Sequence, residues 1–309
     1  VLGCNRQIYA LKRVRLGNKD PEAIRGFIDE ISLLKQLRST PNIIQLVSAQ
    51  VFREEGLIYM VLEYGDIDLA RLLHNHEEAR RARAATGSST PASDPGRSGG
   101  GGEIDENFIR LYWQQMLQAV QGIHELRIVH SDLKPANFML VQGQLKLIDF
   151  GIAKSIQGDT TSINRESQVG TLNYMSPEAI QGGSSNPLGG PPLKVGRPSD
   201  VWSLGCILYQ MIYGRTPFAD LPFIPKMNAI CSDTHVIHMP AGTNPMALDV
   251  MRRCLDRNPR TRITMQELLD HPFLHPERAP SAPAPPLEAP VGQGLAALTE
   301  QQLKSIVSQ

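Results

Sequence analysis

Two aspartates and an asparagine in the middle of the chain could together bind a metal ion. Asp132 and Asn137 precede a segment that predicts a β-hairpin with Gln142-Gly143 at its turn, and Asp149 follows that segment. Because a hairpin brings its two ends together, we expect the three side chains to converge. Carboxylate and amide oxygens suit magnesium, which usually also binds substrate phosphates. The alternative is that these residues only form turns, which aspartate and asparagine favour.

A lysine and a glutamate near the N-terminus could form an ion pair. Lys12 lies in the alternating segment 8–14, which predicts a strand, and projects to the same face as Ala10. Glu30 lies in a segment whose apolar residues follow helical spacing. Alone, such a lysine would be a solvated charge and such a glutamate a surface residue. The pair becomes informative only beside other motifs.

The predicted elements that position these residues change character near residue 64. Before it, the pattern predicts strand, helix and strands, with Leu57 to Glu63 as the last strand. After it helices dominate, and residues 108–126 and 201–213 show the clearest helical patterns, the second apolar nearly all round. We therefore expect an α+β protein with a small β-rich part, residues 1–64, and a larger helical part, residues 65–275.

Three segments are expected to lack regular structure. Residues 77–102 form an insertion that is predicted to be disordered, because its composition cannot bury enough apolar surface. Residues 181–198 form a loop rich in glycine and proline, and residues 276–309 form a tail rich in proline and alanine, mostly disordered.

Composition excludes several function classes. The 309 residues carry 31 basic and 31 acidic side chains, so the formal net charge is zero and no nucleic acid or membrane partner is expected. The apolar runs are too short to span a bilayer, and no secretory signal is visible. Four cysteines form no CxxC pair, which argues against a zinc site and favours a reducing compartment, nucleus or cytoplasm.

The order of the motifs resembles that of eukaryotic protein kinase catalytic domains. The matching segments are Tyr9-Ala10-Leu11-Lys12, His130-Ser131-Asp132, Asp149-Phe150-Gly151, Gly170–Glu178, Asp200–Gly205 and Arg262, which would pair with Glu178. The resemblance covers about residues 1–275. It implies a bilobal fold and phosphoryl transfer from ATP, with Mg²⁺, to protein hydroxyl groups.

The resemblance also assigns roles. Asp132 would accept or orient the substrate hydroxyl proton, and Lys134 would place positive charge beside the transferring phosphoryl group. Asn137 and Asp149 would hold magnesium, and Lys12, paired with Glu30, would contact the phosphates. Six residues would line the adenine site: Ala10 as its cover, Met60 at the back, Glu63, Tyr64 and Gly65 as the hinge, and Leu140. His130, Phe150 and Asp200 are expected to be structural.

Longer segments resemble the monopolar-spindle kinase family, dual-specificity kinases of the spindle assembly checkpoint. These segments are Ile58–Leu69, Val129–Phe138, Leu147–Ala153 and Asp159–Ser162. The resemblance implies action on serine and threonine, with tyrosine in addition, and partnership with kinetochore or checkpoint scaffold proteins. It also implies localisation at the kinetochore or spindle.

The chain departs from the kinase pattern at Ser131, where most kinases have an arginine that pairs with a phosphorylated loop. Five loop hydroxyls are candidate phosphorylation sites: Thr160, Thr161, Ser162, Ser167 and Thr171. Transient self-association would allow one copy to modify another. Thr171 has the alternative of a structural hydroxyl near Asp132 and Lys134.

A second departure is that the chain starts after the position of the first strand and glycine-rich loop of kinases. We therefore expect a truncated small lobe and weak activity of this chain alone. The alternatives are a pseudokinase scaffold, favoured only by this departure and Ser131, and a small-molecule kinase. The segment Gly170–Glu178 argues against the latter, since it resembles the peptide-positioning segment of protein kinases.

Overall fold

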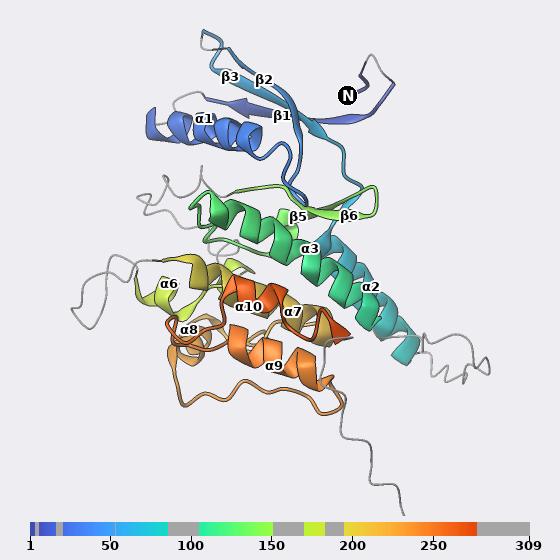
Figure 1. Cartoon of the computed structure of the whole chain (residues 1–309), viewed down its shortest axis with the longest axis vertical. Coiled ribbons are helices and arrows are strands. Elements are labelled where there is room, and N and C mark those ends of the chain that lie inside the picture. The colour runs from blue at the N-terminus through green and yellow to red at the C-terminus, as the bar shows by residue number, and fades with distance from the viewer. Residues whose placement is uncertain are drawn as a thin grey trace, which may run out of the picture. The chain divides into compact units, whose positions relative to one another are not determined.

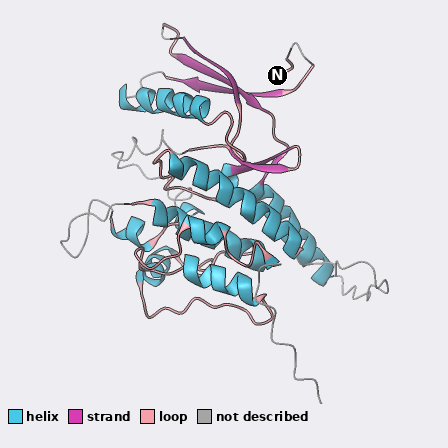
Figure 2. Cartoon of the chain, viewed as in Figure 1, coloured by secondary structure: helices cyan, strands magenta, loops and turns pink. Residues whose placement is uncertain are grey.

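The computed structural model describes residues 1–3, 6–16, 21–52, 54–85, 105–150, 170–182 and 195–276. The chain divides into two units, Val1–His275 and Pro276–Gln309. Every helix and strand named below belongs to the first unit (Figures 1 and 2). The predicted tail falls almost wholly outside the described residues.

An antiparallel sheet and one helix form the N-terminal part of this unit. The sheet has the order β1-β3-β2, with β1 at Tyr9–Arg15, β2 at Leu46–Phe52 and β3 at Leu57–Glu63. Along β1, Ala10, Lys12 and Val14 are half-buried while their neighbours Leu11 and Arg13 are exposed, which confirms the predicted alternation. Helix α1, Pro21–Gln36, packs beside the sheet (Figure 1), and its Ile31, Leu33 and Leu34 are buried.

A second small sheet follows the connection from β3. It consists of β4 at Ile67–Asp68, β5 at Phe138–Val141 and β6 at Gln144–Leu147. β5 and β6 form the predicted hairpin, because Val141 pairs with Gln144 and the two turn residues, Gln142 and Gly143, both have positive φ angles, 50° and 80°. Ile43 bridges to Leu147, so backbone pairing joins the hairpin to the N-terminal part.

Helices make up the rest of the unit. They are α2 at Leu69–Ala85, α3 at Glu106–Glu125, the 3₁₀ turn η1 at Pro135–Asn137, α6 at Pro177–Gln181, α7 at Arg197–Tyr213, α8 at Phe223–Cys231, α9 at Pro245–Cys254 and α10 at Met265–Leu269. Helix α7 is buried along nearly its whole length, as its all-round apolar sequence predicts, and α3 and α9 pack against it. The architecture is the bilobal α+β fold that the motifs imply.

The structure corrects the bounds of two segments that were expected to be irregular. Residues 77–85 continue α2 rather than opening the insertion. Glu77 forms ion pairs with Arg80 and Arg81, three and four residues onward, which stabilise this part of the helix. In the second segment, Gln181 ends α6 and residues 197–198 begin α7. Within the described residues, no helix is long and apolar enough to cross a membrane.

Candidate active site

The predicted ion pair between the sheet and α1 forms. Lys12 Nζ lies 2.9 Å from Glu30 Oε1. The glutamate side chain is only 4% exposed, whereas the lysine side chain is 39% exposed. A buried carboxylate therefore fixes the lysine, while part of the lysine surface stays open to a ligand. The register of the sheet places Lys12 opposite Met60.

Lys134 joins two parts of the predicted site that are distant in sequence. Its Nζ atom donates to Asp132 Oδ2 at 3.1 Å and to Thr171 Oγ1 at 3.5 Å. All three side chains are partly exposed, so a substrate hydroxyl can approach them. Thr171 thus lies where its alternative explanation, a structural hydroxyl near Asp132 and Lys134, predicts.

The hairpin brings the segments of Asn137 and Asp149 together. The amide of Ile148 donates to the carbonyl of Asn137 at 2.8 Å, and Phe138 pairs with Leu147. Asn137 Oδ1 accepts from the backbone amide of Lys134 at 3.0 Å, which fixes the side chain but leaves a second lone pair for a ligand.

The donor set suits magnesium better than a metal held wholly by protein. Among the described residues, no group of three or more histidine, cysteine, aspartate or glutamate side chains could hold a metal ion. Magnesium is commonly held by one or two protein oxygens together with substrate phosphates and water. An amide oxygen and a carboxylate at the end of one hairpin fit that chemistry.

His130 links the two aspartates through hydrogen bonds. Its Nδ1 atom accepts from the backbone amide of Asp132 at 3.3 Å, so the ring proton resides on Nε2, which donates to the carbonyl of Asp149. The sequence predicted only a structural role for this histidine. The link was missed because it depends on two backbone groups, which no residue type reveals.

Asp200 fixes the backbone that leads into Asp132. Its fully buried carboxylate accepts from the amides of His130 at 2.9 Å and Ser131 at 2.8 Å, and it contacts His124 Nε2 at 2.7 Å. Ser131 has a φ of 66°, in the left-handed region that is costly for a residue with a side chain. The two hydrogen bonds to Asp200 offset that cost, which confirms the structural role expected for Asp200.

Strand pairing and burial make Leu62 a second candidate, beside Met60, for the back of the predicted adenine site. Ala10 pairs with Leu62, and Leu62 is half-buried. Met60, which was expected at the back, is 0% exposed and packs into the core. Leu62 projects to the same face of the strand as Met60 but lies next to the hinge. The alternation of side chains along the strand is compatible with either Met60 or Leu62 at this position. Only their different burial distinguishes the two residues.

Strand β5 lies next to the predicted hinge, where the lower side of the predicted adenine site is expected. Ile67 pairs with Leu140, and the amide of Asp66 donates to the carbonyl of Leu140 at 2.8 Å. A Cβ atom at Gly65 would lie 2.1 Å from Met139 Cγ and 3.0 Å from the Leu140 oxygen. The close approach of the hinge to β5 therefore requires glycine.

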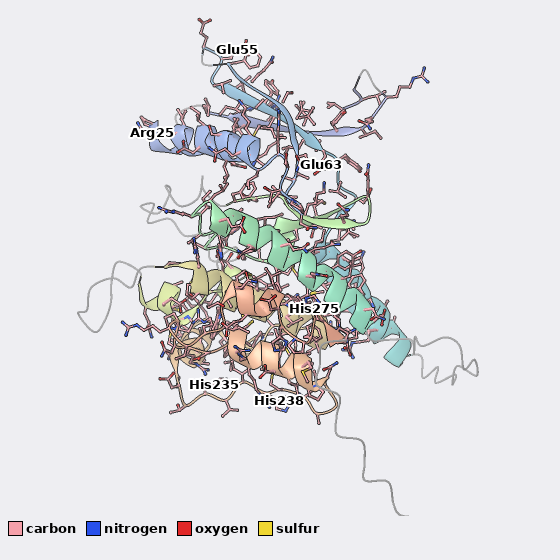
Figure 3. All side chains as sticks on the ribbon, viewed as in Figure 1. Arg25, Glu55, Glu63, His235, His238 and His275 are labelled. Carbon is pink, nitrogen blue, oxygen red and sulfur yellow. The ribbon has the colours of Figure 1, made fainter. Side chains whose placement is uncertain are left out.

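Glu63 uses its carboxylate to connect the two sheets. Lys146 Nζ lies 2.7 and 2.8 Å from its two oxygens, and the amide of Gln45 donates to Oε1 at 2.8 Å. Glu63 lies between the N-terminal sheet and the β5–β6 hairpin (Figure 3). Its side chain is thus engaged, and its backbone amide also donates to the carbonyl of Gln45 at 3.1 Å. Tyr64 is 50% exposed.

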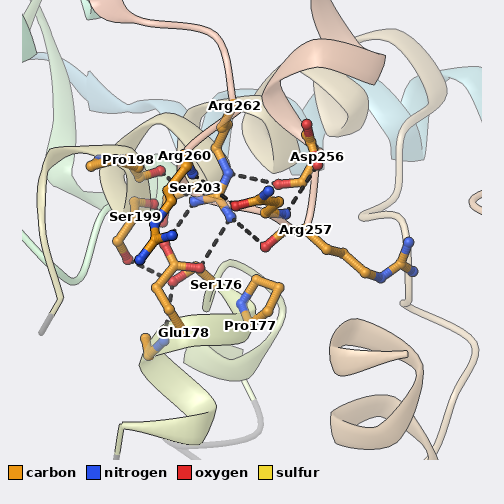
Figure 4. Close-up of polar contacts among 12 residues, drawn as sticks. Ser176, Pro177, Glu178, Pro198, Ser199, Ser203, Asp256, Arg257, Arg260 and Arg262 are labelled. Carbon is orange, nitrogen blue, oxygen red and sulfur yellow. Dashed lines mark hydrogen bonds and ion pairs between the residues drawn. The ribbon is translucent and has the colours of Figure 1, made fainter. Parts of the chain in front are cut away.

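A buried ion pair holds the segment that follows Thr171. Arg262 donates to both oxygens of Glu178, at 2.7 and 3.0 Å, as the motifs predict, and also to the carbonyl of Pro198 at 2.7 Å (Figure 4). Ser176 caps α6 by accepting from the amide of Ala179. The position of Thr171 therefore depends on contacts made far away in sequence.

Several predicted residues fall outside the described part of the chain. They are Gly151 and the candidate phosphorylation sites Thr160, Thr161, Ser162 and Ser167.

The comparisons with known proteins agree with this geometry. The family model of the protein kinase domain matches residues 2–274. The chain is 46% identical to the serine/threonine-protein kinase mph1 of Schizosaccharomyces pombe, over 88% of this chain and 40% of that protein. It is 44% identical to the dual specificity protein kinase Ttk of Danio rerio, over 91% of this chain and 26% of that protein.

A third relative is the serine/threonine-protein kinase MPS1 of Saccharomyces cerevisiae, 39% identical over 89% of this chain and 34% of that protein. The chain thus spans between about a quarter and two fifths of these relatives. They bear out the resemblance to the monopolar-spindle kinases. With a matching family model over nearly its whole described length, the chain belongs to the protein kinase domain family.

Proposed function

We propose that this chain is the catalytic domain of a dual-specificity protein kinase that transfers the γ-phosphoryl group of ATP to serine, threonine and tyrosine hydroxyls of proteins. The observation that carries the proposal is the Lys134 bridge between Asp132 and Thr171. The bridge brings the carboxylate of Asp132 and the ammonium of Lys134 next to Thr171, where we expect the substrate-positioning segment to begin. Lys12, held by Glu30, supplies the second positive charge that binding of a triphosphate needs.

The reaction follows from the positions of these side chains. Asp132 orients the incoming hydroxyl and accepts its proton, while Lys134 offsets negative charge on the transferring group. Lys12, which Glu30 holds in place, binds the α- and β-phosphates. Asn137 and Asp149 would hold magnesium, which would supply positive charge against the charge of the phosphates. His130 and Asp200 keep Asp132 in position.

The adenine ring would occupy the space between the sheet and β5. Ala10 would cover it, Leu140 would lie below it, and Leu62 rather than Met60 would close the back. Backbone groups of Glu63, Tyr64 and Gly65 would pair with the ring edge.

The biological setting is proposed from the relatives. Their names describe serine/threonine and dual specificity kinases. We infer action in spindle checkpoint signalling, on kinetochore or checkpoint scaffold proteins, at the kinetochore or spindle of dividing cells. The loop hydroxyls Thr160, Thr161, Ser162 and Ser167 stay predicted autophosphorylation sites, modified by a second copy.

A transfer assay tests the proposal. Full-length protein is incubated with magnesium and ATP labelled at the γ-phosphate, with casein as a general protein substrate and a panel of small hydroxyl-bearing metabolites as competitors. We expect label on protein serine, threonine and tyrosine, and none on the metabolites. Asp132→Asn should reduce the rate by a factor of at least about 10³, as loss of a central catalytic group does.

The alternatives give different results in the same assay. A pseudokinase scaffold would transfer no label above the Asp132→Asn background, although it could still bind ATP. A small-molecule kinase would label a metabolite and leave casein unmodified. Either result would refute the proposed function.

A further inference from the structure

A pocket on the helical lobe lies between α3, the start of α7 and the loop leading into α10. Its volume is about 440 Å³, within the range of small-molecule sites. Its walls are mainly apolar, and they include Pro198, Val201, Ile263 and Met265. None of the residues assigned to phosphoryl transfer lines it. We call it the α3–α7–α10 pocket.

The charged groups of this pocket favour an anion. Arg197 and Arg260 line it and are exposed, and among the described residues neither of them forms an ion pair. Arg197 is held in place, because its Nη2 donates to the carbonyl of His124 at 2.6 Å. Arg262 also lines the pocket, but Glu178 neutralises it. Among the described residues, the one carboxylate in the lining is Glu125, which accepts from Gln121 at 3.2 Å. The described lining thus holds two guanidinium groups outside any ion pair of the described residues and a single carboxylate.

The pocket shares two of its wall residues with the contacts that position the active site. His124 contacts the Asp200 carboxylate that holds the amides of His130 and Ser131. Arg262 holds Glu178, at the end of the segment that begins at Thr171 (Figure 4). The side chains of His124 and Arg262 are only 3% and 0% exposed, so a ligand in the pocket would lie against the few exposed atoms of these two residues and restrict their motion. Both supports of the catalytic geometry would become more rigid.

We propose that the α3–α7–α10 pocket binds a small organic anion, an apolar body that carries one carboxylate or phosphate group, and that the bound anion stabilises the backbone around Asp132. The apolar body contacts the proline, valine, isoleucine and methionine walls. The anionic group pairs with Arg197 and Arg260, for which a planar carboxylate or a phosphate is the matching acceptor. Binding does not depend on the proposed function, whereas any effect on turnover does.

Calorimetric titration of the full chain with matched probes tests the binding. The probes are biphenyl-4-carboxylate, biphenyl-4-yl phosphate and, as the neutral control, biphenyl-4-carboxamide. We expect saturable binding of at least one anion and about ten-fold weaker binding of the amide, as for loss of a hydrogen bond to a charged group. The two anions distinguish a carboxylate site from a phosphate site.

Three variants assign the binding to this pocket. Arg260→Gln, an exposed change, should weaken anion binding several-fold, and Arg197→Gln about ten-fold. Glu125→Gln should strengthen it, because it removes the opposing charge. The amide should respond to none of the three. Circular dichroism confirms that each variant is folded. If Arg197→Gln does not fold, Arg260→Gln alone still tests whether the anion binds in this pocket.

Hydrogen exchange measures the coupling without any reference to activity. The bound anion should slow hydrogen exchange at the backbone amides of His130 and Ser131, which donate hydrogen bonds to Asp200. It should not slow exchange at amides of the distant strand β2. The proposal is overturned if neither anion binds saturably, if the amide binds equally well, or if the arginine variants leave anion binding unchanged. Binding without slower exchange would overturn the coupling.

Discussion

At the scale of single residues, the site depends on a few charged side chains that other side chains hold in place. Lys12 depends on the buried Glu30, and Lys134 depends on Asp132 and Thr171. In each case the ammonium group is partly exposed while its partner fixes its direction. The positions of the two lysine ammonium groups therefore depend on the side chains that bind them as much as on the lysines themselves.

Removing the partner of Lys12 should impair ATP use without unfolding the protein. We expect Glu30→Gln to lower kcat/KM for ATP about 10- to 100-fold, because a hydrogen bond between charged groups contributes about 1.5–3 kcal/mol. Steady-state kinetics with varied ATP measure this. The neighbouring exposed Asp29 supplies the control, and Asp29→Asn should behave as the unmodified protein. An equal loss in both variants would contradict a specific role for the pair.

Substitutions at Thr171 can distinguish a structural role of its hydroxyl group from a regulatory role. We expect Thr171→Ser to keep most activity, since it preserves the hydroxyl that Lys134 contacts, and Thr171→Val to lower kcat about ten-fold. Initial rates at saturating ATP and substrate check this. If Thr171→Ser were as inactive as Thr171→Val, the hydroxyl contact would not be the reason. If Thr171→Glu raised the rate, the residue would be regulatory.

At the scale of elements, the motifs predicted the parts with a strong local signal. The hairpin was predictable because Gln142-Gly143 suits a turn with two positive φ angles, and α7 because its sequence is apolar all round. The end of α2 was missed because the composition of residues 77–102 was taken as a whole. The ion pairs of Glu77 with Arg80 and Arg81, three and four residues onward, stabilise the helix up to Ala85.

The hinge glycine should be replaceable only if β5 yields. Gly65→Ala places a Cβ against Met139 and the Leu140 carbonyl, so we expect a loss of about 1–3 kcal/mol in the free energy of unfolding and weaker ATP binding. Met139→Ala in the same chain should recover part of this loss. Urea unfolding and ATP titration of the single and double variants measure both. Independent, additive effects would show that the two residues do not collide.

Glu77 should make the stability of α2 depend on acidity. Hydrogen bonds from Arg80, opposed by burial and aided by Arg81, lower the pKa of Glu77 from 4.5 to about 2. Since the folded pKa is the lower one, this stabilisation is present above about pH 4.5 and is lost as the pH falls toward 2. The difference in unfolding free energy between the unmodified protein and Glu77→Gln should thus be constant from pH 7 to 5 and shrink below pH 4.5. A difference that does not change with pH would contradict the ion pairs.

At the scale of the whole molecule, contacts between distant segments decide the site. The pair of Glu178 and Arg262 was predictable only because the motifs resembled those of kinases, and the His130 link was not predictable at all. The same limit applies to Leu62, whose proposed place at the back of the adenine site rests on the complete burial of Met60. Sequence patterns identify which residues can react, and packing decides which of them are exposed.

The buried pair should be essential for stability. We expect Arg262→Met alone to cost about 3–5 kcal/mol of unfolding free energy, because Glu178 would stay buried without its partner. The double variant Glu178→Leu with Arg262→Met should recover much of that loss, since it buries no charge. Urea unfolding of the unmodified protein, the single variant and the double variant measures both differences. A double variant that is less stable than Arg262→Met would mean that the pair is worth more than its desolvation cost.

The anchoring of His130 and Ser131 to Asp200 has a consequence for how this protein fails. Asp200 belongs to α7, the most deeply buried helix described, and its carboxylate fixes the strained turn before Asp132. The reactive turn therefore cannot relax while the centre of the lobe stays intact. On slow warming, catalytic output and near-ultraviolet ellipticity of the buried Trp113 and Trp202 should disappear over one temperature range, and cooling before that range should restore full output.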